Sequence, residues 1–245
     1  YFARYSPFGG APNFLSDGDL FSVLKRQKPT HLSFVNSVSE IFPDEEDRFQ
    51  QIEKILAQLR EFEKKDSRPR YLLVVEPGSK ESSRELARLK DRIQEEKIGS
   101  VLLPCLDQRR CGALRDPKDW CHEEVACEFP DWVNQLGMEA GLRKESMLFS
   151  YAWIRAGSIT PLVPKGFRIV SQRMERKGQV ECRLCSAEGK ISARVQRSKA
   201  TEENQFFFES CRGDIWKSLD LGPKGDIERA QSAFQIQESI FHQKS

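Results

Sequence analysis

Residues 70–105 read RYLLVVEPGSKESSRELARLKDRIQEEKIGSVLLPC, and this stretch decides the fold class. It opens with a continuous apolar run over residues 71–75, which is typical of a strand buried on both faces. The sequence EPGS at residues 76–79 ends that run, and the residues after it place Leu86, Leu89 and Ile93 on one face of a helix. A second apolar run, residues 98–103, predicts the next strand. The stretch therefore predicts the strand–helix–strand unit of a parallel α/β sheet.

The residues before this stretch extend the pattern. Residues 20–24 predict a short helix, and residues 30–41 begin as a strand that ends at Asn36 and Ser37. Pro43 and Asp44 then open a helix. Its apolar residues recur at helical spacing: Phe49, Ile52, Ile55, Leu56, Leu59 and Phe62. We therefore expect a right-handed parallel sheet whose ligands gather at the carboxyl ends of its strands.

The residues after the stretch predict a different kind of sheet. Residues 129–142 indicate a helix and residues 146–154 a long core strand. Strands at 168–171, 179–185 and 191–195, with turns at 174–178 and 187–189, indicate an antiparallel β-meander. Residues 205–208 suggest a short aromatic strand, and residues after Pro223 an amphipathic helix. The predicted organisation is a domain over residues 1–160, a β extension over 161–222 and a helical tail over 223–245.

Composition limits the classes of function. The chain has 245 residues with a net charge of +2, which argues against a general polyanion binder but leaves room for local basic clusters. No apolar run reaches the roughly 18 residues of a membrane span, so we expect no membrane partner. Seven cysteines without a secretion signal favour a reducing compartment in which thiolates serve as ligands.

Four of the cysteines lie in residues 104–127, PCLDQRRCGALRDPKDWCHEEVAC, which show neither a helical nor a strand period and predict a long loop. They are Cys105, Cys111, Cys121 and Cys127, and a CxxC pair, Cys182 and Cys185, ends a later strand. Thiolates select zinc or iron–sulfur clusters, and loose spacing in a loop favours a cluster. Zinc and free cysteines remain alternatives. His122 could be a further ligand, although such a histidine is more often a neighbour of the ligands.

Basic residues near aromatic ones favour contacts with RNA phosphates and bases. They gather at residues 109–110, 173–177 and 194–199, beside Trp120 and the phenylalanines at 206–208. The alternative is an ordinary charged surface. No triad for nucleophilic catalysis can be recognised. Asp17 and Asp19 precede a short helix, where an acidic residue could bind an adenine amine or simply cap the helix.

Five segments together resemble a known family. They are LLVVEPG (residues 72–78), LPC (103–105), DWCH (119–122), KESMLFSY (144–151) and LCSAEG (184–189). In this order they are similar to the methyltransferase-like family of mitochondrial small-ribosomal-subunit assembly factors and its bacterial relatives. The resemblance covers about residues 30–214.

The resemblance implies a Rossmann-like class I S-adenosylmethionine methyltransferase fold, of which this chain carries the second half of the sheet without the first part or its glycine loop. It also implies a 4Fe–4S cluster. Its ligands would be Cys105, Cys111, Cys121 and Cys185, with Cys182 as the alternative to Cys185. If S-adenosylmethionine binds, Asp17 and Asp19 would lie near the adenine and Asn36 near the reacting end.

The resemblance further implies an assembly factor that binds rRNA and ribosomal proteins of the immature small subunit, in the mitochondrial matrix or, for a bacterial relative, the cytoplasm. Outside the ribosome we expect a monomer. The RNA-binding residues would be Arg109, Arg110, Arg173, Arg176 and Lys177. Two alternatives remain: an active S-adenosylmethionine-dependent rRNA methyltransferase and a zinc-stabilised binding module.

Overall fold

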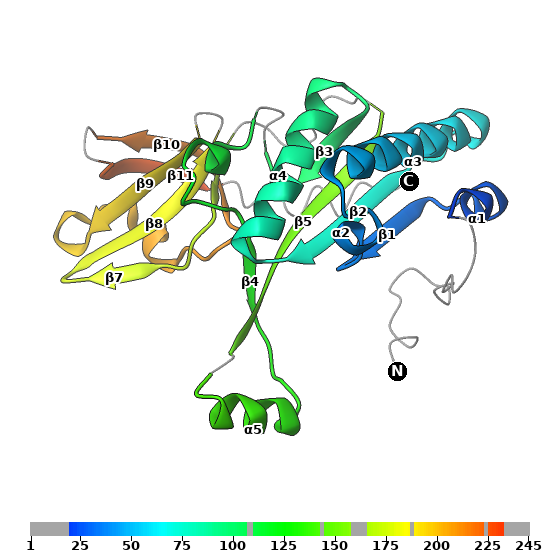
Figure 1. Ribbon diagram of the computed structural model, residues 1–245. Coiled ribbons are helices and arrows are strands. Elements are labelled where there is room, and N and C mark those ends of the chain that lie inside the picture. Colours follow the sequence, from blue (N-terminus) through cyan, green and yellow to red (C-terminus); the bar gives the residue numbers. More distant parts are fainter. Residues whose placement is uncertain are drawn as a thin grey trace.

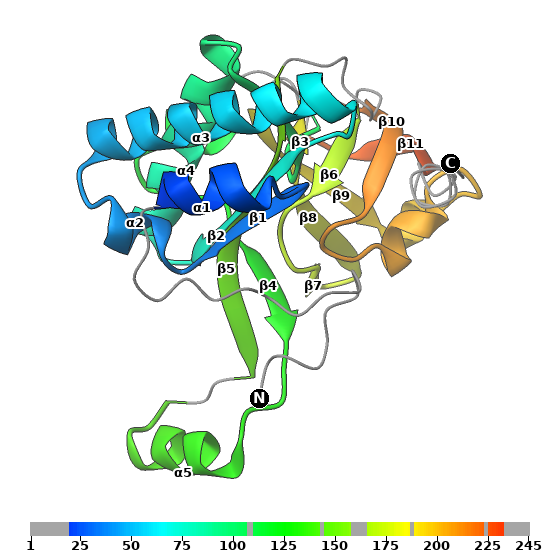
Figure 2. The same ribbon diagram turned by 90° about the vertical axis from the view of Figure 1, so that its right-hand side faces the viewer.

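The computed structural model describes residues 20–106, 110–142, 145–157, 166–186, 189–222 and 225–232. These residues form a mixed α/β structure with two sheets, each with its own hydrophobic core. Figures 1 and 2 show the two sheets side by side, with a narrow projection below them. Within the described ranges, no helix is both long and apolar enough to cross a membrane.

The first sheet contains the strands predicted around residues 70–105. Its elements are α1 (Leu20–Gln27), β1 (His31–Val35), α2 (Val38–Ile41), α3 (Glu45–Asp66), β2 (Tyr71–Pro77), α4 (Lys80–Glu95), β3 (Gly99–Leu103), β4 (Glu123–Ala126) and β5 (Ser146–Ala156). The predicted helix starts are confirmed. Asp44 accepts a hydrogen bond from the Asp47 amide (2.8 Å) at the start of α3, and Ser79 accepts one from the Ser82 amide (3.2 Å) at the start of α4.

The strand order is β1-β2-β5-β3, which corrects the prediction of a purely parallel sheet. β1 and β2 pair in parallel, as expected. β5 runs between β2 and β3 and is antiparallel to both. A long strand that arrives late in the chain has therefore taken the place beside β2, because its apolar residues Ala152 and Ile154 complete the core.

β2 is also less buried than its apolar run suggests. Leu72 and Val74 are fully buried, whereas Tyr71, Leu73 and Val75 on the opposite face are half-buried. α3 and α4 pack next to each other and cover the fully buried face. The prediction of a strand covered on both faces was thus wrong for the described residues, since helices cover only one of them.

The projection, which we call the arm, comprises residues 123–149. β4 pairs antiparallel with the first part of β5, from Glu123 opposite Phe149 to Ala126 opposite Ser146. α5 (Asp131–Glu139) connects the two strands, and none of its residues is buried. Both views show α5 at the far end of the arm, away from the two sheets. The predicted helix is confirmed over its central part, and the predicted loop over 104–127 ends in a strand.

The second sheet is antiparallel, as the turns predicted. It is built from β6 (Phe167–Ile169), β7 (Met174–Arg176), β8 (Gln179–Ser186), β9 (Gly189–Gln196), β10 (Ile215–Leu221) and β11 (Ile227–Ser232). Two predictions were wrong. Residues 205–209 form the 3-10 helix η4 rather than a strand, and residues 227–232 form β11 rather than part of a helix. In both places pairing or packing with the rest of the sheet outweighs the weak local pattern.

Candidate functional site

Four cysteines line one cavity between the two sheets. Cys105 follows β3, Cys111 precedes the 3-10 helix η2 (Gly112–Arg115), Cys121 precedes β4, and Cys185 lies in β8. The cavity has a volume of about 40 Å³, several times the roughly 10–15 Å³ that one water molecule needs. The structure thus brings together the four thiols that the family resemblance singled out.

The CxxC pair is divided between two environments. Cys182 and Cys185 are three residues apart in β8, so their side chains point to opposite faces of the sheet. Cys182 is completely buried in the core of the second sheet, beside Leu184 and Phe207. Cys185 faces the cavity. Between the two cysteines that the resemblance allowed, the geometry favours Cys185.

The remaining candidates from the loop lie elsewhere. Cys127 follows β4 on the arm, where its amide donates to the Glu145 carbonyl (3.3 Å). His122 stacks on Trp120 with ring centroids 5.7 Å apart, and it is not among the residues that line the cavity. Burial lowers the pKa of His122, with Arg212 adding to the effect. His122 therefore packs beside the site.

Arg84 holds the cysteine loop against α4. Its guanidinium donates to the backbone carbonyls of Ala113 (3.2 Å), Asp116 (2.8 Å) and Asp119 (2.6 Å). A single planar donor group thus satisfies three carbonyls of a segment that has little secondary structure of its own. These bonds fix the path of the chain between Cys111 and Cys121.

Two further contacts fix the ends of this path. The Cys111 amide donates to both carboxylate oxygens of Asp91 (2.9 and 3.0 Å). On the other side, Lys190 of β9 donates to the Asp119 carboxylate (2.8 Å) and to the Trp120 carbonyl (2.9 Å). These bonds therefore tie the cysteine loop to α4, which packs on the first sheet, and to β9 of the second sheet.

Lys90 places a buried cation beside Cys105. Its ammonium lies 3.5 Å from the Cys105 sulfur, and the residue is only 4% exposed. Burial by itself lowers the pKa of Lys90, but its interactions with Cys105, Cys121 and Cys111 raise it on balance, since each of these cysteines adds negative charge beside the ammonium once it ionises. A buried lysine that stays charged requires negative charge beside it.

The thiols themselves are desolvated. Burial raises the pKa of Cys111 to about 11 and that of Cys185 to about 12, and it also raises the pKa of Cys121. At neutral pH such thiols keep their protons unless a metal displaces them. The described residues contain no group of three or more His, Cys, Asp or Glu side chains arranged to hold a metal ion.

Sequence reasoning missed Lys90, Asp91, Arg84 and Lys190. Position 90 is four residues after Leu86, so it falls on the apolar face of α4, and a lysine there was the available signal. Arg84 and Asp91 carry no comparable signal, because charged residues are ordinary on an exposed helix surface.

Gly112 gives a direct test of the contact between the loop and the second sheet. A Cβ at this position would lie 2.5 Å from the Gly189 Cα and 3.0 Å from the Lys190 amide nitrogen, both backbone atoms. Gly112→Ala is therefore expected to force the loop away from β9 and to destabilise the protein by about 1–3 kcal/mol, as other overpacked sites do. Chemical denaturation measures this change.

The control is Gly141→Ala on the arm, where an added Cβ meets no atom within 4 Å and only the positive φ is strained. This control should leave the reactivity of the cavity thiols toward a thiol reagent unchanged, whereas Gly112→Ala should increase it. Equal thiol reactivity in the two variants would contradict the close contact between Gly112 and β9.

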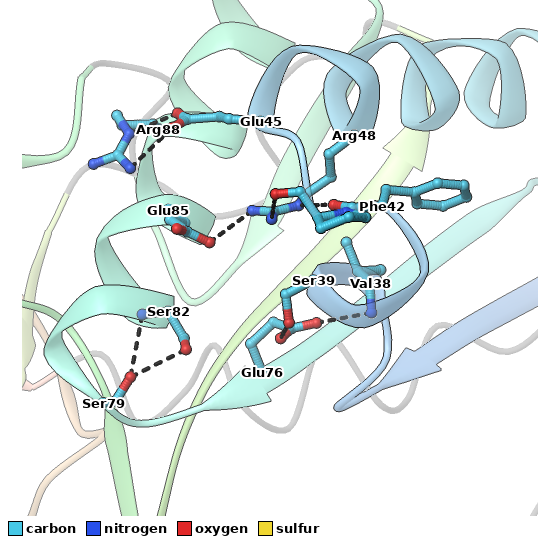
Figure 3. Close-up of polar contacts among 11 residues, drawn as sticks. Val38, Ser39, Phe42, Glu45, Arg48, Glu76, Ser79, Ser82, Glu85 and Arg88 are labelled. Atoms are coloured by element: carbon cyan, nitrogen blue, oxygen red, sulfur yellow. Dashed lines mark hydrogen bonds and ion pairs between the residues drawn. The ribbon is translucent and has the colours of Figure 1, made fainter.

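Asn36, the predicted residue near the reacting end of a methyltransferase, lies at the carboxyl end of β1. It is exposed and has a positive φ of 49°, which asparagine tolerates better than most residues. The turn after it is fixed by Glu76, which accepts hydrogen bonds from the Val38 amide (3.1 Å) and the Ser39 hydroxyl (2.7 Å), as Figure 3 shows. Asp17 and Asp19 lie outside the described residues.

The predicted RNA-binding residues come from two parts of the chain, the cysteine loop and the region around β7. Arg110 lines the cysteine cavity and pairs with Glu95, and Arg109 lies outside the described residues. Arg173 pairs with Glu175 (3.4 Å) and donates to the Phe208 carbonyl. Arg176 and Lys177 are exposed at the turn between β7 and β8.

Comparison with known proteins supports the part of the resemblance that concerns the mitochondrial small ribosomal subunit. The model of a family described as "Mitochondrial small ribosomal subunit Rsm22" matches residues 37–219, which include most strands of both sheets and all four cysteines of the cavity. A search of curated proteins finds no significant match.

Proposed function

The chain belongs to the family described as mitochondrial small ribosomal subunit Rsm22, and we propose that it is an assembly factor of that subunit, binding rRNA and carrying a structural 4Fe–4S cluster. Family membership supports the association with the small ribosomal subunit and the mitochondrial location. The cluster, the contact with rRNA and the role in assembly go beyond it.

One observation carries the proposal: four thiols from two sheets meet in a single cavity. Three come from the loop that follows β3 of the first sheet. The fourth comes from β8 of the second sheet, about sixty residues later in the chain. Buried cysteines usually pack singly among apolar side chains, as Cys182 does here. Four half-buried cysteines around one cavity match the Cys₄ ligand set of a 4Fe–4S cluster.

The loose spacing of the cysteines along the sequence favours a cluster over zinc. In a tetrahedral zinc site each sulfur lies about 2.3 Å from one ion. A four-iron cluster is wider than an ion, because each thiolate binds a different iron atom. The cavity, at about 40 Å³, offers more space than one ion needs.

The charges around the cavity also suit a cluster. Cys105, Cys111, Cys121 and Cys185 would hold it as thiolates, and Lys90 would compensate part of their negative charge. When bound, the cluster would supply a rigid cross-link between the loop and the second sheet, so its binding free energy would contribute to folding. The desolvation that raises the thiol pKa values also limits access of water to the site.

The described residues at the carboxyl end of β1, where S-adenosylmethionine was expected, leave no room for it. The pocket beside the turn after β1 is lined by Val38, Ser39, Arg48 and Glu76, among others, and has a volume of about 10 Å³, space for roughly one water molecule. Its polar groups already bind one another: Arg48 donates to Glu85 (2.7 Å), and Glu76 is occupied as described above. We therefore derive no methyl-transfer step for this chain.

The proposal is tested by purifying the protein without oxygen and measuring iron, sulfide and the visible spectrum. We expect about four iron and four sulfide per chain, with absorbance near roughly 400 nm. Colourless protein that contains zinc would overturn the cluster. A separate measurement, cosedimentation with purified small-subunit precursors, tests the ribosomal association, and failure to sediment would overturn that part.

A further inference from the structure

The arm carries most of the exposed apolar surface of the described structure. Among the described residues, seven of the nine exposed large apolar side chains lie between residues 123 and 149. Trp132 is 66% exposed and Leu136 is 56% exposed, and Met138 and Leu142 are exposed to a similar degree. Exposed apolar surface in this concentration is typical of a site that another molecule covers.

The arrangement of these side chains fits a docking face. Trp132 and Leu136 are four residues apart in α5, so they lie on the same side of the helix. The arm does not need these side chains for its own structure. Its two strands are held by the pairing of β4 with β5, and Asn134 ties α5 to the arm by donating to the Phe129 carbonyl (3.0 Å).

The charge of the arm identifies the kind of partner. Residues 123–149 contain six acidic and two basic side chains, although the whole chain has a net charge of +2. Glu123 and Glu124 at the base bind Arg168, Ser146 and Gln172. The other four acidic residues are exposed around the apolar ones: Glu128, Asp131, Glu139 and Glu145.

Such a surface would repel nucleic acid. Phosphate groups bind arginine and lysine, and the arm has only two basic residues, Arg143 and Lys144, against six acidic ones. A tryptophan could stack on a base, but stacking sites on RNA-binding proteins are accompanied by positive charge. Complementarity instead requires a partner with positive charge around an apolar contact.

We propose that the arm is a docking site for a protein segment rich in lysine and arginine that also presents apolar side chains to Trp132 and Leu136. This inference rests on the proposed function only for the place of the partner, which would be a protein of the small subunit. The arm would thus attach the chain to protein, while other parts of the chain contact rRNA.

The test compares arm variants of the complete protein in cosedimentation with purified small-subunit precursors. Trp132→Ser combined with Leu136→Ser is expected to weaken binding by about tenfold or more, since a buried tryptophan is a common energetic centre of an interface. Asp131→Lys combined with Glu139→Lys should also weaken binding and should make the remaining binding less dependent on salt. Ile41→Ser, an exposed apolar residue outside the arm (54% exposed), is the matched control and should bind as the parent does.

A photo-cross-linking residue in place of Leu136 then identifies what lies on the arm. Cross-links to basic segments of small-subunit proteins support the proposal. Cross-links to rRNA, to a second copy of this chain or to another segment of the same chain overturn it. If the parent binds precursors and the arm variants bind equally well, the arm inference alone is wrong. If the parent does not bind, the ribosomal association in the proposed function is wrong.

Discussion

Replacing Cys185 by serine is expected to abolish cluster binding and to loosen the contact between the cysteine loop and the second sheet. Cys185 is the one thiol in the cavity that β8 supplies, so its loss removes the link between the two sheets. Iron should fall from about four per chain to well below one. Because metal binding at structural sites contributes directly to folding, the loss of stability should reach several kcal/mol.

Iron analysis and denaturant unfolding measure the two effects, and limited proteolysis should locate the new cleavage sites in the loop and the second sheet. Cys182→Ala is the informative control. Its side chain is buried in the core of the second sheet, so this variant should lose stability through a cavity yet retain its iron. Cys211→Ser, at an exposed position, should change neither quantity. Full iron content in the Cys185→Ser protein would contradict the assignment.

Lys90→Met is expected to have opposite consequences in the loaded and the iron-free protein. With the cluster bound, the buried ammonium faces negative thiolates. Its removal leaves that charge uncompensated, which costs about 3–5 kcal/mol when a buried pair is broken. Without iron, Cys111 and Cys185 keep their protons at neutral pH, because burial raises their pKa values, so less negative charge surrounds the ammonium. Lys90 is then a buried cation that is costly to keep, and methionine should be neutral or stabilising.

Denaturant unfolding of both forms, prepared with and without iron, measures this reversal. Lys80→Met is the matched control, since Lys80 is exposed at the start of the same helix. It should change the stability of neither form by more than about 0.5 kcal/mol. Equal destabilisation of both forms by Lys90→Met would mean that Lys90 serves only the fold of the loop.

Local patterns predicted the elements well because their causes are local. The helices α3 and α4 follow from apolar residues at helical spacing and from the capping residues Asp44 and Ser79. The predicted turn at residues 174–178 and the predicted strand at 179–185 likewise indicated antiparallel pairing, which the structure confirms. Patterns failed where they were weak, as in β4, whose sequence EEVA becomes a strand only through pairing with β5.

The sequence by itself determined the strand–helix–strand unit, the antiparallel second sheet and the set of cysteines from which a metal site could be built, since apolar period and turn chemistry act over a few residues. Strand period also required Cys182 and Cys185 to point to opposite faces. Only the tertiary structure decided which of them meets the loop, because that depends on the face that the second sheet turns toward α4 and η2. Packing between segments far apart in the chain also placed β5 beside β2. It likewise brought Lys90 of α4 next to the Cys105 thiol.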